Sequence, residues 1–77
     1  MWKGTINING VQVSVEAHES QSGYIKDWGG VGKVIGNDFL HADMYDTELG
    51  QIIINYIDYL SGNFTFVGSG VPMINLN

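Results

Sequence analysis

The chain has 77 residues, no cysteine, three lysines, no arginine and eight acidic residues, so its formal net charge is −5. This length allows one domain at most, and the missing cysteines exclude disulfides and thiolate metal sites. The few cations argue against direct binding to nucleic acid or to an anionic membrane. A domain of this size buries only about 60% of its unfolded surface, so we expect a dense core, a homo-oligomer, or both.

The first eighteen residues predict a β-hairpin. Asn9-Gly10 suits a two-residue turn in which both central residues have positive φ. Apolar and polar residues alternate on either side of it, which predicts one buried face and one wet face. The cross-strand pairs expected on the buried face are Ile8–Val11, Ile6–Val13, Gly4–Val15 and Trp2–Ala17.

The middle of the chain predicts two further strands. Residues 19–23 are polar and read as a turn, after which a third strand runs from Tyr24 to about Ile35. Residues 36–38 break the chain again. Alternation in residues 39–45 then predicts a fourth strand with Leu40, Ala42 and Met44 on one face, followed by a hairpin loop at residues 46–50.

The last third predicts two strands and an apolar tail. In "TELGQIIINYIDYL" (47–60) helical spacing competes, but Gly50 and three consecutive isoleucines favour a strand. "FTFVGSG" predicts a sixth strand with Phe64 and Phe66 inward. We therefore predict an all-β fold, a small six-stranded antiparallel β-barrel or strongly bent sheet, in one domain over residues 1–77. The apolar segment 71–77 docks either on its own barrel or on a neighbouring subunit.

The glycine-rich stretch "KDWGGVGKVIG" (26–36) resembles a phosphate-binding loop only superficially. Lys33 precedes valine where a P-loop needs serine or threonine, and position 35 holds isoleucine where a dinucleotide turn needs glycine. We favour a strand in which glycines let the backbone bend or pass close to another chain segment. The Trp28 side chain would then lie across the faces vacated by Gly29 and Gly30.

A functional alternative places the same tryptophan at the surface. Beside glycines, an exposed aromatic ring makes a flat platform for a ligand or a partner protein. The predicted binding residues are Trp28, Tyr24, Lys26 and Asp27.

Catalytic and metal sites have weaker support. His41 and Asp43 share a face of the predicted fourth strand, and His18 would complete a chemically adequate ligand set, but polar residues on a wet strand face explain them as well. The carboxylates available for acid–base chemistry would need a cleft, and a small barrel fills its interior with side chains. These carboxylates are Glu16, Asp27, Asp43 and Asp58. We predict no catalytic residue, no metal and no cofactor.

Two motifs carry a resemblance that spans most of the chain. A tryptophan-glycine-glycine strand and a closing F-x-G-S-G-x-P resemble those of small uncharacterised bacterial β-barrel domains. The matching residues are Trp28, Gly29, Gly30, Phe66, Gly68, Ser69, Gly70 and Pro72. The resemblance implies a barrel, and it implies no activity.

The function expected from these observations is a non-catalytic binding or interaction module for a protein or small molecule. The alternative is a phage or mobile-element inhibitor of a bacterial defence system, which acts by binding a protein or by sequestering a small ligand. The N-terminus lacks the apolar run of a signal peptide, and no apolar stretch is long enough to span a bilayer, so we expect a cytoplasmic location.

Overall fold

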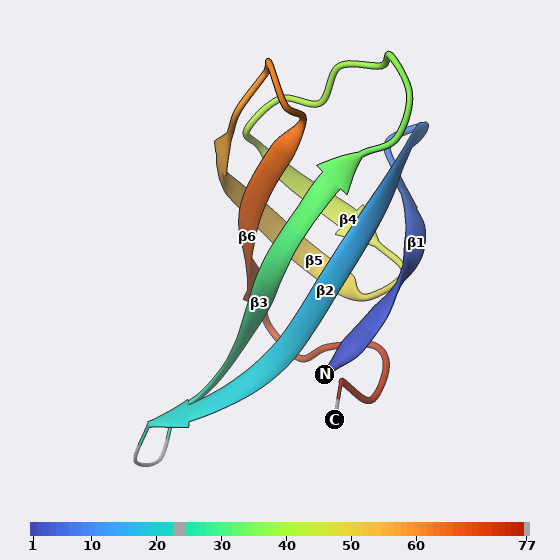
Figure 1. Ribbon diagram of the computed structural model, residues 1–77. Helices are drawn as coiled ribbons and strands as arrows, with labels where there is room; N and C mark the ends of the chain where they lie inside the picture. Colours follow the sequence, from blue (N-terminus) through green and yellow to red (C-terminus); the bar gives the residue numbers. More distant parts are fainter. Residues whose placement is uncertain (23–24, 77) are drawn as a thin grey trace.

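The computed structural model describes residues 1–22 and 25–76 and shows one antiparallel sheet curled into a half-barrel (Figure 1). Its strands are β1 (Trp2–Ile8), β2 (Val11–Ser22), β3 (Ile25–Val34), β4 (Met44–Thr47), β5 (Gly50–Ile57) and β6 (Asn63–Ser69). Across the sheet they follow the order β1-β2-β3-β6-β5-β4, and the edge strands β1 and β4 approach each other without pairing in the part described. The prediction of a small six-stranded barrel or strongly bent sheet is confirmed, with curling that stops short of closure. The described residues contain no helix long and apolar enough to cross a membrane.

The β1–β2 hairpin has the predicted register. Ile8 lies opposite Val11 and Ile6 opposite Val13. Asn9 has a φ of 53° and the glycine after it a φ of 89°, as the two-residue turn requires. All four apolar residues of these pairs are buried, whereas the residues between them in the sequence are exposed. The alternation in the sequence therefore identifies the buried face correctly.

The ends of β2 and β3 form a two-stranded arm that extends beyond the rest of the sheet (Figure 1). Pairing continues from His18–Gly29 to Ser22–Ile25, and the molecule measures 40 × 19 × 18 Å. The predicted turn at 19–23 is therefore wrong for 19–22, which are strand. No neighbouring strand lies on either side of the arm, so its strands need no apolar face. Polar residues there therefore do not indicate a turn.

The fourth strand is shorter and later than predicted. Residues 39–43 are not in a strand, and β4 pairs with β5 from Met44 to Thr47. The turn that follows is tight, because the Thr47 hydroxyl donates to the Gly50 carbonyl at 2.7 Å and accepts the Leu49 N–H at 3.1 Å. Leu49 is fully buried although it lies in the turn. No alternation pattern in the sequence reveals this burial.

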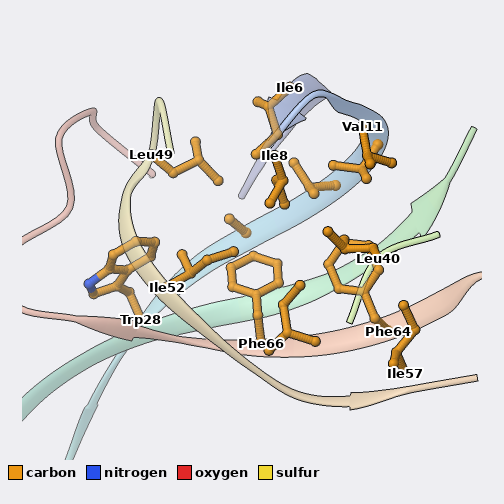
Figure 2. Close-up of a cluster of buried hydrophobic side chains, with 14 of the residues drawn as sticks. Ile6, Ile8, Val11, Trp28, Leu40, Leu49, Ile52, Ile57, Phe64 and Phe66 are labelled. Atoms are coloured by element: carbon orange, nitrogen blue, oxygen red, sulfur yellow. The ribbon is translucent and has the colours of Figure 1, made fainter. Parts of the chain in front are cut away.

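The core fills the inside of the curled sheet (Figure 2). Ile52 and Ile54 of β5 point inward, and so do Phe64 and Phe66 of β6, whose rings lie 6.2 Å apart. Segment 50–57 is thus a strand and not a helix, and the inward positions of both phenylalanines are confirmed.

The glycine-rich stretch is part of strand β3, as predicted. Gly30 and Gly32 face the interior. A Cβ at Gly30 would collide with the backbone carbonyl of Glu16 on β2, and one at Gly32 would collide with the Phe64 ring. Each glycine therefore lets a backbone or an aromatic ring approach β3 closely.

Segment 71–76 docks on the chain's own sheet. The Met73 N–H donates to the Leu49 carbonyl at 2.8 Å, Leu76 is fully buried, and Ile74 packs against the core. Docking on a neighbouring subunit, the other placement left open by the sequence, stays a prediction. Val71 and Met73 themselves stay exposed.

Candidate functional site

Trp28 is a core residue. Its side chain is only 5% exposed, and its indole N–H donates to the Gly70 carbonyl at 2.8 Å. The ring covers Gly68 on β6, where a Cβ would overlap the indole, and it also lies close to Gly50. The ring thus packs across strands, on Gly68 of β6. The interpretation of Trp28 as an exposed platform is wrong, since its faces are already covered (Figure 2).

The other predicted binding residues lie along the arm or outside the described part. Asp27 is exposed and opposite Ser20, and Lys26 is opposite Gln21 in the register. Tyr24 lies outside the described residues. A binding role for Lys26 and Asp27 stays a prediction. The Trp28 ring, which was expected at the centre of this binding surface, is buried and is not part of it.

The predicted pair His41 and Asp43 lies in the connection before β4 and not on a strand. The Tyr45 hydroxyl donates to the His41 carbonyl at 2.8 Å, and the Asp43 carboxylate accepts the Met44 N–H at 2.7 Å. Burial, and then the charge of Asp43, raise the pKa of Tyr45. His18 is exposed on the arm. Within residues 1–22 and 25–76, no three histidine, aspartate or glutamate side chains are grouped closely enough to hold a metal ion.

Apolar side chains gather on the loops at one end of the half-barrel. Phe39, in the connection between β3 and β4, is 72% exposed, and Leu60, in the turn between β5 and β6, is 101% exposed. Ile35 and Tyr59 are exposed beside them. The two loops border a hollow of about 250 Å³. We call the surface formed by Ile35, Phe39, Tyr59 and Leu60 the loop end.

Hydrogen bonds hold the turn that carries Leu60. The Asp58 carboxylate accepts the Leu60 N–H at 2.9 Å, and the Asp58 carbonyl accepts the Gly62 N–H at 2.8 Å. The Ser61 hydroxyl accepts the Asn63 N–H at 3.1 Å. Hydrogen bonds from Leu60 and then from Ser61 lower the pKa of Asp58. Asp58, which interrupts an apolar run in the sequence, therefore holds the shape of the turn.

The connection that carries Phe39 is anchored next to it. Leu40 is buried in the core. The His41 ring lies against the ring of Tyr59, with centroids 6.0 Å apart, and the His41 Nδ1 atom is 3.4 Å from the Tyr59 hydroxyl. The predicted shared face of Leu40, Ala42 and Met44 is wrong, because only Leu40 is buried. A buried anchor and a ring contact thus present Phe39 to solvent.

A second surface is an open groove on the outer face of the sheet, with a volume of about 410 Å³. Its most prominent ring belongs to Tyr56, which is 63% exposed. A β-bulge places it there, because Ile54 pairs with Phe66 whereas Tyr56 pairs with Thr65, which leaves Asn55 as an extra residue. The side chains that border this outer groove include Ser14, Val31, Lys33, Tyr56, Asn63 and Thr65.

Sequence reasoning missed both surfaces, although signals for them exist. Leu60 is an apolar residue directly before the turn signal "SGN", and Phe39 directly follows "GND". The bulge is visible as inward residues Ile54 and Ile57 at a spacing of three, which breaks the period of two that a regular strand requires.

Comparison with models of protein families, with curated proteins and with solved structures gave no match. The resemblance to small bacterial β-barrel domains therefore stays a prediction.

Proposed function

We propose that this protein is a non-catalytic interaction module that binds another protein through its loop end. The proposal rests on one observation: Phe39 and Leu60 are both largely exposed to water, on loops that are themselves anchored. An exposed leucine alone is common on protein surfaces. Two large apolar side chains on neighbouring anchored loops are characteristic of a binding surface.

The anchoring favours binding because it reduces the entropy lost on association. The Asp58 cap fixes the backbone that carries Leu60, and buried Leu40 fixes the backbone beside Phe39. Loops ordered before binding lose less freedom in the complex than loops that must order on contact. Leu60 and Phe39 are thus suited to enter an apolar pocket of the partner.

Charge indicates the chemistry of that partner. The hollow between the two loops is bordered by Asp38, and Asp58 lies in the adjoining turn, while no lysine of the described part of the chain borders the hollow. A partner with basic residues around its apolar pocket would match this rim. A second copy of this chain would bring two acidic rims together, so we assign the loop end to a different protein. The self-association predicted from the chain's size stays a prediction.

Affinity capture with matched variants tests the proposal. The variant Phe39→Ser/Leu60→Ser removes the two apolar side chains of the loop end. The variant Val71→Ser/Met73→Ser changes two similarly exposed apolar residues, 83% and 73% exposed, of the segment after β6. Burial of a leucine and a phenylalanine contributes about 3 to 6 kcal/mol, so the first variant should bind at least ~100-fold more weakly.

The partner captured by the wild-type protein should be retained by the Val71/Met73 control and lost by the loop-end variant. Thermal unfolding should be nearly unchanged in both variants, because the replaced side chains are exposed. Equal capture by all three proteins would remove the loop end as the binding surface. Capture that fails only with the control variant would move the surface to the segment after β6.

A further inference from the structure

Two rows of outward side chains form the outer groove. The strand register places residues from β2, β3 and β6 in a polar row, which consists of Ser14, Lys33 and Asn63. The neighbouring row crosses β2, β3, β6 and β5 and consists of Glu16, Val31, Thr65 and Tyr56. Both rows point outward, and the backbone of Gly32 lies between them, where a Cβ would point inward at the Phe64 ring. Lys33 therefore lies on one side of the groove, and the apolar side with Val31 and Tyr56 lies opposite, with Glu16 at its β2 end.

The bulge in β5 gives the apolar side its shape. Asn55 and Tyr56 are consecutive and both exposed, which an uninterrupted strand does not allow. The Thr65 hydroxyl donates to the Asn55 Oδ1 atom at 2.7 Å, so the extra residue is tied to β6 and the tyrosine beside it is held in place. Bulges often redirect a side chain in this way next to a functional site.

Lys33 is the cation that borders the groove, in a protein that is acidic overall. Glu16 borders the groove, but its carboxylate lies 3.2 Å from the Lys3 ammonium group. Among the side chains of residues 1–20 and 27–76 this is the only ion pair, so the Lys33 charge is not balanced by an acidic partner there. A hydroxyl at Ser14 and an amide at Asn63 stand in the same row and can donate to an anion.

We propose that the outer groove binds a small planar aromatic anion. The ring would pack against Tyr56 and Val31, and the anionic group would lie at Lys33 with Ser14 and Asn63 as further donors. A volume of about 410 Å³ lies in the range of sites for single small molecules. Flat rings stack favourably on an exposed tyrosine, and a lysine ammonium group binds a phosphate or a carboxylate. This inference is independent of protein binding at the loop end.

Amide chemical shifts of the full chain, titrated with four probes, test this proposal. Adenosine 5′-monophosphate and 2-naphthoate each combine a ring with an anion, one a phosphate and the other a carboxylate. Adenosine has the ring alone, and inorganic phosphate has the charge alone. We expect both aromatic anions to shift amides around Lys33, Tyr56 and Thr65 at millimolar concentration, with adenosine weaker and phosphate weakest. A preference between the two aromatic anions identifies the anionic group.

Three variants separate the contributions of the ring and the charge. Tyr56→Ser should weaken the binding of both aromatic anions about ten-fold, since a stacked ring is lost. Lys33→Gln should weaken the binding of both anions about three- to five-fold without affecting the binding of adenosine. Lys33→Arg should keep the affinity of the wild type for both anions. The matched control is Val71→Ser, which removes an exposed apolar side chain of the segment after β6 and should leave binding unchanged.

The proposal is overturned if neither aromatic anion shifts groove amides, or if phosphate alone reproduces the shifts. It is equally overturned if Tyr56→Ser and Lys33→Gln both bind as the wild type does. Dispersed amide spectra of the variants confirm that they are folded, so a loss of binding can be assigned to the groove.

Discussion

Replacement of Gly68 by alanine is expected to destabilise the protein strongly, because the new methyl group would occupy the space of the Trp28 indole. The ring is held in place, since it is buried and its indole N–H donates to the Gly70 carbonyl. Either the two strands separate locally or the ring leaves the core. Overpacking usually costs about 1 to 3 kcal/mol, and loss of a buried tryptophan costs about 3 to 5 kcal/mol. We therefore expect Gly68→Ala to lower the free energy of unfolding by about 3 kcal/mol.

Gly4→Ala is the matched control. A Cβ at Gly4 would also meet a tryptophan ring, that of Trp2, at 2.7 Å. Trp2 is only partly buried, so its ring can rotate toward solvent. We expect Gly4→Ala to change the free energy of unfolding by no more than about 0.5 kcal/mol, since alanine also suits a strand better than glycine does. Two glycines beneath tryptophan rings thus differ only in whether the ring is able to move.

Urea and thermal unfolding followed by circular dichroism measure both effects. For a domain of this size, about 3 kcal/mol corresponds to a drop in Tm of roughly 12 to 24 °C. In the double variant Gly68→Ala/Trp28→Leu the two costs should add to less than their sum, because the smaller side chain leaves room for the methyl group. If Gly68→Ala and Gly4→Ala were equally stable, the steric argument for Trp28 would be refuted.

Leu76→Ala should cost about 2 to 5 kcal/mol, because Leu76 is fully buried. The cost should not depend on protein concentration, whereas docking on a neighbouring subunit would make it do so. The pKa of Asp58 is lowered in the folded state, so the hydrogen bond from the Leu60 N–H to its carboxylate contributes stability at pH values above 3.8, the ordinary pKa of the group. This contribution is lost as the pH falls through the lower pKa of the folded state. The stability difference between the wild type and Asp58→Asn, measured by urea unfolding from pH 6 to pH 2, should therefore shrink as the pH falls; a constant difference would contradict this role of the carboxylate. Deletion of Asn55 should restore a regular β5–β6 ladder and leave the fold intact, as measured by circular dichroism. It should also change the position of Tyr56 and weaken the binding of aromatic anions in the groove. Unchanged affinity would mean that the bulge does not shape that site.

The hairpin was predictable from the sequence because everything that determines it is local. Asn9-Gly10 sets the turn, and the turn sets the register of every following pair. The same holds for Phe64 and Phe66, whose inward positions follow from alternation within one strand.

The partners of Trp28 were not predictable by the same reasoning. Neighbours along a strand alternate between faces, so Gly29 points away from the face on which the indole lies. The ring instead packs on Gly68, which is distant in the sequence and is brought beside it when β3 pairs with β6. Which glycine a ring covers depends on strand order, and strand order depends on long-range pairing that no local pattern encodes.

Both candidate surfaces lie where the strand pattern is interrupted. The bulge at Asn55 breaks the period of two in β5, and it places Tyr56 at the outer groove. Asp58 ends the same apolar run, and its carboxylate shapes the turn that exposes Leu60. Neither interruption improves the core: a regular ladder would pair every residue of β5, and a polar residue in place of Leu60 would suit a solvent-exposed turn better. Local rules broken without a gain in packing are expected at functional positions, and on this ground we place binding at the two ends of one short segment, residues 55–60.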